Sequence, residues 1–366
     1  MPELDVLRAE LAEIDKKIMA LVGRRNEIAK VIGAEKAKTG AAVVVPSVER
    51  VVEQRYIDAG AECGVTANTA FRIARAVVDE SVGVQGCLPR FQEPQTICII
   101  GGNGGMGRWL SKFFSVRGHK VSICDPNTDG AEFPVVSLEE GAKSDIIVIS
   151  TPVTIADKVL ADVLESSSDD AVIFDILSVK QPVIPRLRDA GKAGRKVCSV
   201  HPMFGPSAQS AAGRNVIICD CGSKDAADKA EVLFNVADIL RMEVEEHDKA
   251  AAYVLGLSHA VNIAFSDALV RSGFTSKALR SSASTTFRKQ TAVSVEVANE
   301  NAELYYAIQR ENPENDAALR NLEEAVSRVR TLPKDEFISM ISWRTTLTPS
   351  SLLKARHSEL RSSSVN

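Results

Sequence analysis

The sequence has little of what nucleic-acid binding, secretion or a membrane span would require. Its 44 lysines and arginines are outnumbered by 48 aspartates and glutamates, so no positive field is available to attract phosphate backbones. The apolar runs stop well short of the about 18 residues that a membrane span needs. The first residues are charged at helical spacing and lack the apolar core of a signal peptide. We therefore expect a cytoplasmic protein with no nucleic-acid and no membrane partner.

Cysteines are present, but not in the patterns that bind metals or form disulfide frameworks. The seven cysteines are odd in number and include no CxxC pair and no cysteine–histidine cluster at ligand spacing. Several lie inside apolar runs, which is typical of buried free thiols in a reducing compartment. We expect no disulfide and no metal.

The first 90 residues show only helical patterns. One long amphipathic helix is indicated over residues 3–38 by apolar side chains at steps of mostly three or four: Leu4, Leu7, Leu11, Ile14, Ile18, Leu21, Ile28 and Ile32. Shorter helices are indicated over 47–59 and 66–84. Three helices in so short a segment bury little apolar surface, so we expect a second copy of the chain to supply partner helices in a homodimer. The segment 91–95 that follows is predicted to be a linker.

From residue 96 to 246, short apolar runs alternate with helical segments. The runs are β-branched and short enough to be strands buried on both faces: TICIIGG, KVSICD, DIIVIST, AVIFDIL, KVCSVHP and NVIICD. This alternation predicts a doubly wound parallel sheet of the Rossmann type. Residues 247–352 return to helical patterns and predict an all-α third domain that is also suited to dimerisation, and 353–366 read as a polar tail.

A glycine-rich turn follows the first predicted strand and precedes a helix. Its spacing fits GxGxxG, in which the glycines allow a tight turn, a close approach to a pyrophosphate and helix packing on the strand. Asp125 ends the next strand, 18 residues after Gly107, where a carboxylate can bind a ribose diol and repel a 2′-phosphate. The pattern therefore predicts an NAD site at Asp125 and at Gly102, Asn103, Gly104, Gly105, Met106 and Gly107.

Three later motifs, STPV, DILSVK and HPMFGP, stand at the ends of predicted strands, where a doubly wound sheet binds its ligands. His201 in HPMFGP is a candidate general base, able to accept a hydroxyl proton as hydride leaves the same carbon. Ser178 in DILSVK is placed to bind the same hydroxyl or the imidazole. These residues predict a dehydrogenase acting on an alcohol.

The motifs GGNGGMG, DILSVK, HPMFGP and EEHDKAAAYVLGLSHA together resemble prephenate dehydrogenase, over about residues 95–340. The resemblance implies oxidative decarboxylation of prephenate to 4-hydroxyphenylpyruvate with NAD. It implies that His201 polarises the ring hydroxyl with support from Ser178, that Thr151 and Pro152 lie against the nicotinamide, and that His259 lies near the substrate side chain.

The same resemblance implies an arginine for a substrate carboxylate, and Arg288 in STTFRKQ matches one. A second arginine, expected about eight residues later, is replaced by Glu296. The residue that binds the carboxylate is therefore Arg288, Lys289 or a residue of another subunit.

The first 90 residues resemble the helical chorismate mutase that some prephenate dehydrogenases carry. Arg8, Arg25 and Lys36 are 17 and 11 residues apart, which places them near one helix face as cations for two carboxylates. The resemblance implies that Arg8 reaches the partner subunit's site, and it adds Glu49, Ser81 and Gln85. It expects arginine where Val48 stands, so either the mutase activity is weak or Arg50 takes that role.

The chain as a whole thus resembles the bifunctional chorismate mutase/prephenate dehydrogenases of tyrosine biosynthesis, for which inhibition by tyrosine is expected. One alternative is a prephenate or arogenate dehydrogenase with an inactive mutase-like dimerisation domain. A β-hydroxyacid dehydrogenase would use a catalytic lysine, which HPMFGP disfavours. A redox sensor that binds NAD without turnover is the non-enzymatic alternative.

Overall fold

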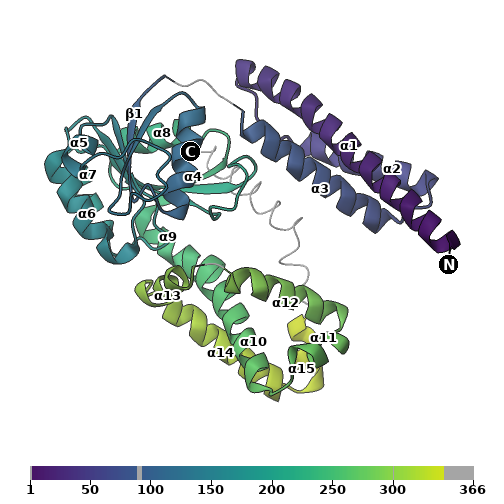
Figure 1. The fold of residues 1–366 in the computed structure, drawn as a ribbon. Coiled ribbons are helices and arrows are strands. Elements are labelled where there is room, and N and C mark those ends of the chain that lie inside the picture. Colours follow the sequence, from purple (N-terminus) through teal and green to yellow (C-terminus); the bar gives the residue numbers. More distant parts are fainter. Residues whose placement is uncertain (1, 89–92, 300, 342–366) are drawn as a thin grey trace, which may run out of the picture. The chain divides into compact units, whose positions relative to one another are not determined.

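The computed structural model describes residues 2–88, 93–299 and 301–341 and separates into two units, Met1–Ala251 and a second unit that starts at Ala252 (Figure 1). Each unit is described by itself. Residues 91 and 92 of the predicted linker and the whole predicted tail 353–366 lie outside the described residues.

The first unit begins with three helices, α1 (Pro2–Thr39), α2 (Pro46–Glu62) and α3 (Ala67–Gly86). Pro46 starts α2, where its missing N–H costs no hydrogen bond, and the Thr66 side chain caps α3 by accepting from the Thr69 amide. A buried stripe on α3 that includes Ala70, Ala74, Val77 and Val78 supplies most of the small core of this helical domain. The three helices predicted from the sequence are confirmed.

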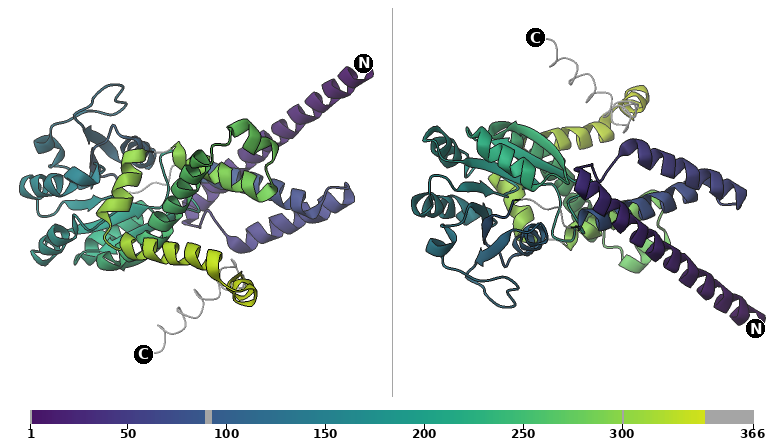
Figure 2. Two further views of the ribbon diagram at one scale, coloured as in Figure 1. Left: turned by 90° about the horizontal axis from the view of Figure 1, so that it is seen from below. Right: turned by 90° about the horizontal axis from the view of Figure 1, so that it is seen from above.

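The N-terminal half of α1 carries its apolar stripe into solvent. Figure 2 shows this half projecting without another helix of the chain beside it. Leu4, Leu11 and Ile18 are 57%, 59% and 51% exposed, so the stripe that the sequence shows is not buried within the single chain.

The rest of the first unit is a seven-stranded sheet with helices on both faces, followed by α9 (Val244–Ala251). Its elements in chain order are β1 (Thr96–Ile100), α4 (Gly105–Val116), β2 (Lys120–Cys124), α5 (Leu138–Gly141), β3 (Ile146–Ile149), α6 (Val153–Ser166), β4 (Val172–Asp175), α7 (Ile184–Lys192), β5 (Val197–Pro202), β6 (Asn215–Asp220), α8 (Lys224–Leu233) and β7 (Asp238–Glu243).

The strand order is β2-β1-β3-β4-β5-β6-β7, and the first five strands are parallel, as predicted. The sheet as a whole is mixed, because β6 runs antiparallel to β5. A loop with no crossover helix joins these two strands, and such a connection can only return antiparallel. The edge strand β7 was not predicted, since its sequence DILRME is largely exposed and lacks an apolar run.

Alternate strand residues feed two separate cores. Ile97 and Ile99 face one core with α4 and α8, whereas Cys98 and Ile100 face the other with α6 and α7. A sheet buried on both faces explains why its strands read as continuous apolar runs.

The second unit is all helical in its described part. It comprises the π-helical turn η1 (Ala252–Leu257), α10 (Ser258–Arg271), α11 (Ser276–Ser281), α12 (Thr285–Ala298), α13 (Ala302–Glu311), α14 (Asn315–Thr331) and α15 (Lys334–Ile341). A cavity of about 990 Å³ lies among α10, α11 and α12 and is lined mainly by apolar side chains.

The segment Val244–Arg271, which joins α9, η1 and α10, is 28 residues long and passes by length and composition for a membrane span. The expectation that no segment would do so was wrong, because the charges stand near its two ends and leave an apolar middle. Core helices of water-soluble proteins pass the same test.

The turn between β1 and α4 requires glycine at position 107, and this requirement can be tested. We expect Gly107→Ala to destabilise the protein by about 1–3 kcal/mol, because its Cβ would lie 2.2 Å from the Gly101 carbonyl oxygen. Gly23→Ala is the control, since an added Cβ there meets nothing within 4 Å. Urea unfolding measures both, and equal midpoints for the two variants would contradict the prediction.

Candidate active sites

The turn between β1 and α4 folds so tightly that a Cβ does not fit at Gly101, Gly102 or Gly107. Gly101 has φ of 78°, which favours glycine, and a Cβ on Gly102 would lie 2.4 Å from Ile123 Cγ2. Helix α4 begins at Gly105 with Gly104 as its N-cap, so the N–H groups of its first turn have no partner within the helix. This arrangement fits a pyrophosphate. Gly101 was missed in the sequence, because the GxGxxG pattern starts one residue later.

Asp125 is bound into the same turn. Its carboxylate oxygens accept the Asn103 and Asn127 amides, each at 2.9 Å. The Asn103 side chain donates in turn to the carbonyls of Asn127 and Asp129. Arg108, which was not predicted, donates from Nε to the Asn103 carbonyl oxygen at 2.9 Å and from its terminal nitrogen to that of Asp129. The acid therefore fixes the loop after β2 against the glycine turn.

The end of β3 offers a further contact for a cofactor. The Thr151 hydroxyl is buried without a hydrogen-bond partner, and Pro152 is the residue before the first turn of α6. Met106, the second residue of α4, packs against one of the two cores of the sheet. An unsatisfied buried hydroxyl and a cradle that excludes Cβ atoms both fit a nicotinamide dinucleotide.

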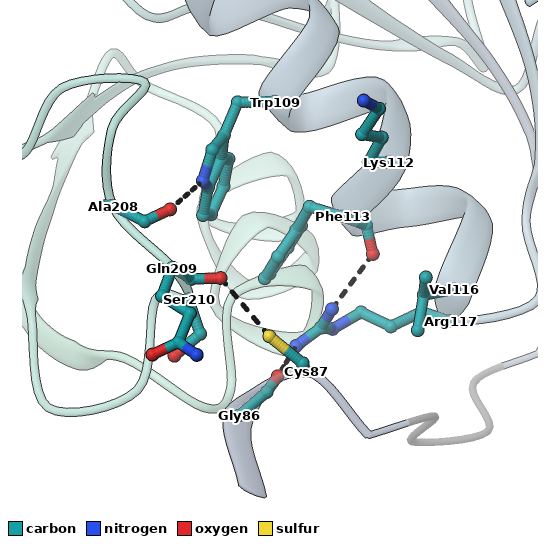
Figure 3. A pocket seen from close by; sticks show the side chains of 10 residues that line it. All are labelled: Gly86, Cys87, Trp109, Lys112, Phe113, Val116, Arg117, Ala208, Gln209 and Ser210. Carbon is teal, nitrogen blue, oxygen red and sulfur yellow. Dashed lines mark hydrogen bonds between the residues drawn. The ribbon is translucent and has the colours of Figure 1, made fainter. Parts of the chain in front are cut away.

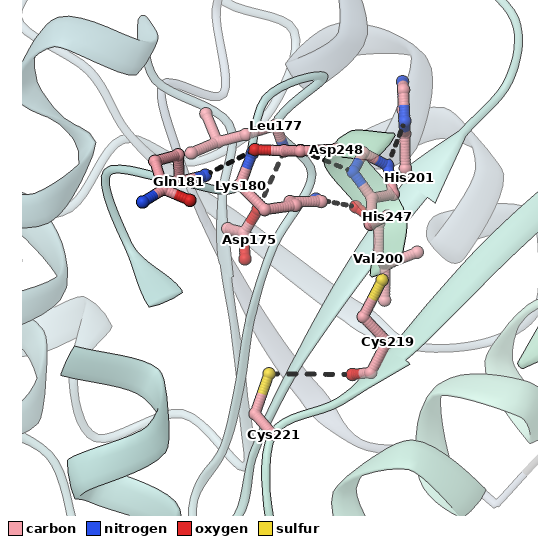
Figure 4. A network of polar contacts seen from close by, with 10 residues as sticks. All are labelled: Asp175, Leu177, Lys180, Gln181, Val200, His201, Cys219, Cys221, His247 and Asp248. Carbon is pink, nitrogen blue, oxygen red and sulfur yellow. Dashed lines mark hydrogen bonds and ion pairs between the residues drawn. The ribbon is translucent and has the colours of Figure 1, made fainter. Parts of the chain in front are cut away.

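His201 is 4% exposed at the end of β5 and starts a chain of hydrogen bonds (Figure 4). Its Nδ1 lies 2.8 Å from Nε2 of His247, and Nδ1 of His247 lies 2.7 Å from Oδ1 of Asp248. Both partners come from α9, and no role was predicted for either from the sequence, although the motif EEHDKAAAYVLGLSHA contains them. The signal for them is the pair HD in EEHDKAAAY.

Asp248 is itself held by backbone donors. Its carboxylate accepts the Lys180 amide at 2.9 and 3.1 Å and the Gln181 amide at 2.8 Å. The fully buried Lys180 Nζ donates to Asp175 Oδ1 and to the Val200 carbonyl oxygen, both at 2.8 Å. The loop after β4, the end of β5 and α9 are thus joined through one polar network.

Burial and neighbouring charges move the pKa values of this network. Desolvation, His247 and Lys180 hold the pKa of His201 well below its usual value. Desolvation also lowers the pKa of His247, against the opposing effect of Asp248. Burial alone would raise the pKa of Asp248, but hydrogen bonds from His247 and the Lys180 amide hold it below its usual value. Both histidines are therefore neutral at neutral pH, and Asp248 is ionised.

Ser178 lies between Asp175 and Lys180 and is half-buried. The hydrogen bond on Nδ1 of His201 goes to His247, so a bond between Ser178 and this imidazole would have to use Nε2. The role of Ser178 stays a prediction.

In the second unit, His259 and Arg288 occupy different surroundings. The His259 ring packs on Tyr305 with centroids 4.3 Å apart, its Nδ1 is buried without a partner, and burial lowers its pKa. Arg288 is exposed and lines the large cavity together with Glu296, while Lys289 is exposed. His259 does not line that cavity.

Three of the predicted residues of the helical domain come together between α1 and α3. Arg25 donates to the Ser81 hydroxyl and to the Val77 carbonyl oxygen. Gln85, buried one turn later, donates to the Ser81 carbonyl oxygen at 3.2 Å and leaves its own Oε1 buried without a partner. Lys36 binds the Val43 carbonyl oxygen at 2.7 Å.

Glu49 and Arg8 are placed differently. Glu49 forms an ion pair with Arg75 of α3 at 3.3 Å, and Arg75 also binds Glu53 and Asp79. Arg75 was not predicted. Arg8 lies in the exposed half of α1 and pairs with Asp5 at 3.1 Å. Val48 is 57% exposed and Arg50 is also exposed.

Among the described residues, no group of three or more His, Cys, Asp or Glu side chains is placed to hold a metal ion. The seven cysteines are free.

Three family models match the chain. They are chorismate mutase type II over residues 7–86, the nucleotide-binding domain of prephenate dehydrogenase over 117–242 and the dimerization domain of prephenate dehydrogenase over 243–343. The glycine turn lies outside these ranges, so its assignment depends on geometry.

Similar proteins combine these parts. The T-protein of Enterobacter agglomerans is 26% identical over 347 residues, which are 92% of this chain and 91% of that protein. A protein named probable arogenate/prephenate dehydrogenase, from Methanocaldococcus jannaschii, is 26% identical over 232 residues. These residues are 60% of this chain and about half (52%) of the length of that protein. Prephenate dehydrogenase from A. aeolicus, solved with hydroxyphenyl propionate and NAD+, shares the fold at 19% identity and a TM-score of 0.56, over 75% of this chain and 99% of that one.

The buried histidines predict how stability depends on pH. Folding lowers the pKa values of His201 and His247. Near and below a histidine pKa of about 6.5, the unfolded chain therefore binds more protons than the folded chain does. The free energy of unfolding should therefore fall as the pH drops from about 7.5 to about 5.5, measured by urea unfolding. His119 and His259 share this direction. The slope should become shallower, but not vanish, in His201→Asn/His247→Asn, and an unchanged slope would contradict the prediction.

Proposed function

We propose that the chain belongs to the bifunctional chorismate mutase/prephenate dehydrogenase family and that it converts chorismate to prephenate and prephenate to 4-hydroxyphenylpyruvate with NAD. The network that ends at His201 is the observation that carries the dehydrogenase part. It joins an ionised carboxylate to the buried histidine at a strand end, where a doubly wound sheet binds its ligands.

The network fixes the tautomer of both histidines. Asp248 accepts the proton on Nδ1 of His247, so the Nε2 of that ring carries a lone pair and accepts the Nδ1–H of His201. The Nε2 of His201 is then unprotonated and can accept the proton of the ring hydroxyl. Its lowered pKa keeps it in this form at neutral pH.

The reaction balances with one base. The bound nicotinamide supplies the hydride acceptor, and His201 takes the hydroxyl proton as the carbon that bears the hydroxyl becomes a carbonyl. The ring carboxylate leaves as carbon dioxide, its bonding electrons enter the ring, and aromatisation follows with the oxygen regaining a proton. Ser178, a half-buried residue of the loop after β4, would hold the hydroxyl. Thr151 and Pro152 would lie against the nicotinamide.

Asp125 and its neighbours favour NAD over NADP. Each oxygen of Asp125 accepts one amide and keeps capacity for the ribose hydroxyls, and its charge would repel a 2′-phosphate. Arg108 lies nearby, but its Nε and a terminal nitrogen are bound to backbone carbonyls. The pyrophosphate would lie at the residues from Gly102 to Gly107.

For the mutase reaction, the helices need to bind a dianion and stabilise charge on the breaking ether bond, because the rearrangement requires no nucleophile. Arg25 and Lys36 would supply cations, and Gln85, one turn after Ser81, has an unused buried oxygen. Glu49 binds Arg75, which gives this domain a further guanidinium near the position where Val48 replaces arginine. Arg8 would act in the site of a second copy, since it is exposed on its own chain.

A second copy of the chain would also cover two apolar surfaces that are exposed in the single chain. The stripe on α1 is exposed in the single chain, and only 11% of the most apolar part of Val244–Arg271 is buried. The last matched family domain is a dimerization domain. We place the protein in the cytoplasm as a homodimer in which these surfaces are covered.

One observation favours a second candidate function, a prephenate or arogenate dehydrogenase whose mutase-like domain only dimerises. Val48, which stands where an arginine is expected, is exposed. Glu49 forms its ion pair with Arg75 and not with Arg25. The carboxylate of either substrate would be bound by Arg288, Lys289 or a residue of the partner, and His259 would lie near the substrate side chain. A redox sensor is disfavoured, because a sensor has no need of a buried base network.

The first test is NADH formation by the purified protein, with prephenate or chorismate as the substrate. We expect turnover with both and a preference for NAD over NADP of at least about tenfold, which corresponds to about 1.4 kcal/mol. Turnover of prephenate alone would support the second candidate, and turnover of arogenate alone would identify the amino analogue as substrate. No turnover with any of the three would favour the sensor.

Added tyrosine should lower the rate of NADH formation, and an unchanged rate at saturating tyrosine would exclude this inhibition.

The base network makes a separate prediction. We expect His201→Asn to lower kcat for prephenate by about 100- to 10,000-fold, the range for losing a general base. His247→Leu removes the acceptor for the Nδ1–H of His201 and should lower kcat at least about tenfold with little change in KM. His247→Gln, whose side-chain oxygen can accept that proton, should recover part of the loss. A wild-type kcat in His247→Leu would show that the tautomer is not fixed by His247.

A further inference from the structure

The chain between β5 and β6, residues 203–214, begins directly after the base-bearing strand end and has no helix or strand of its own. It is nevertheless well covered, since Ser210, Ala211 and Ala212 are 5%, 0% and 6% exposed. Inside the loop, the Ala208 amide binds Gly205 and the Arg214 amide binds Ala211. The shape of this loop therefore depends on the elements that it packs against.

One of these elements is the C-terminal end of α3, which belongs to the helical domain. A Cβ on Gly86 would lie 2.5 Å from Ser210 Oγ and 2.6 Å from Ala212 Cβ, and one on Gly83 would lie 2.0 Å from Gln209 Oε1. The Cys87 thiol donates to the Gln209 carbonyl oxygen at 3.2 Å (Figure 3). Two glycines on one helix face thus mark a close approach between helix and loop.

The other element is α4, whose N-terminus forms the cofactor turn. The Trp109 indole donates to the Ala208 carbonyl oxygen at 2.6 Å and stacks on Phe113 (Figure 3). The buried Arg117 at the end of α4 donates to the Phe113 carbonyl oxygen and, at 3.3 Å, to that of Gly86. These residues close a small apolar cavity of about 180 Å³ at the junction of α3, α4 and the loop.

The same loop also touches the dehydrogenase machinery. Pro206 would meet a Cβ on Gly105 at 3.1 Å, which places it against the first residue of α4. Phe204 packs edge-on against Trp109 with centroids 5.0 Å apart. His201 lies two residues before the loop. A shift of the loop would therefore reach both the base and the cofactor turn.

We propose that the end of α3 positions loop 203–214, so that the mutase domain holds the dehydrogenase site in its active geometry. Gly83 and Gly86 are positioning residues in this sense, and they touch neither the base nor the cofactor turn. The inference rests on the proposed function. Since α3 also carries Ser81 and Gln85, a ligand in the mutase domain contacts the helix that supports this loop.

Gly86→Ala tests the inference with prephenate supplied directly, so that the mutase step is not needed. We expect kcat/KM for prephenate to fall at least about tenfold, because a displacement of about 1 Å at a catalytic group can cost about 100-fold. Gly23→Ala in the same domain should have no effect, since its Cβ would meet nothing within 4 Å. Adding Ser210→Gly and Ala212→Gly to Gly86→Ala removes the atoms that clash and should restore the rate to within about twofold of the same loop changes alone.

Tryptophan fluorescence provides a second readout. The chain has two tryptophans, so Trp343→Phe leaves Trp109 as the reporter of the junction. We expect Gly86→Ala to shift the Trp109 emission and the loop changes to reverse the shift. A shifted emission with wild-type dehydrogenase activity would overturn the inference, and so would an unshifted emission. If Gly86→Ala loses activity together with a lower Tm, and the two loop changes do not restore that activity, Gly86 has only a structural role and the inference is overturned. If the unsubstituted protein fails to oxidise prephenate, the proposed function fails, and the emission still tests the contact itself.

Discussion

The hydrogen-bonded chain from Asp248 through His247 to His201 is the interaction on which the dehydrogenase site depends. A histidine that is only 4% exposed has its tautomer set mainly by its protein neighbours. Asp248 can stay ionised there because the Lys180 and Gln181 amides and His247 satisfy its oxygens. The arrangement requires α9, β5 and the loop after β4 to meet, and Lys180 joins them through Asp175 and the Val200 carbonyl oxygen.

Glycine serves two purposes in the first unit, and only one of them is to leave room for a ligand. In the cofactor turn, Gly107 lets α4 approach the Gly101 carbonyl oxygen, and Gly104 leaves the N-terminus of the helix open. On α3, Gly83 and Gly86 instead let a loop of the sheet domain lie against a helix of the mutase domain. Close packing of a helix backbone against the loop's side chains transmits small displacements, because a densely packed contact has little room to adjust.

Exposed apolar surface is the second constraint on this chain. The single copy leaves the α1 stripe and much of Val244–Arg271 uncovered, and one such helix could equally be read as a membrane span. A second copy of the same chain can cover such surfaces, so no further protein is needed. Arg8, proposed to act in the site of that copy, pairs with Asp5 in solvent on its own chain.

The sequence by itself determined the three N-terminal helices, the first six strands, the glycine turn and the candidate base, because each follows from local periodicity or from a motif of fixed spacing. It could not show that β6 turns back antiparallel, that Gly101 adopts a positive φ or that Asp125 binds the amide of Asn103. Tertiary structure alone joined His247 and Asp248 to His201, 46 residues away from His247, and Arg75 to Glu49, 26 residues away. Such contacts depend on how separate elements pack, and a hydrogen-bond partner that is distant along the chain leaves no periodic trace in the sequence.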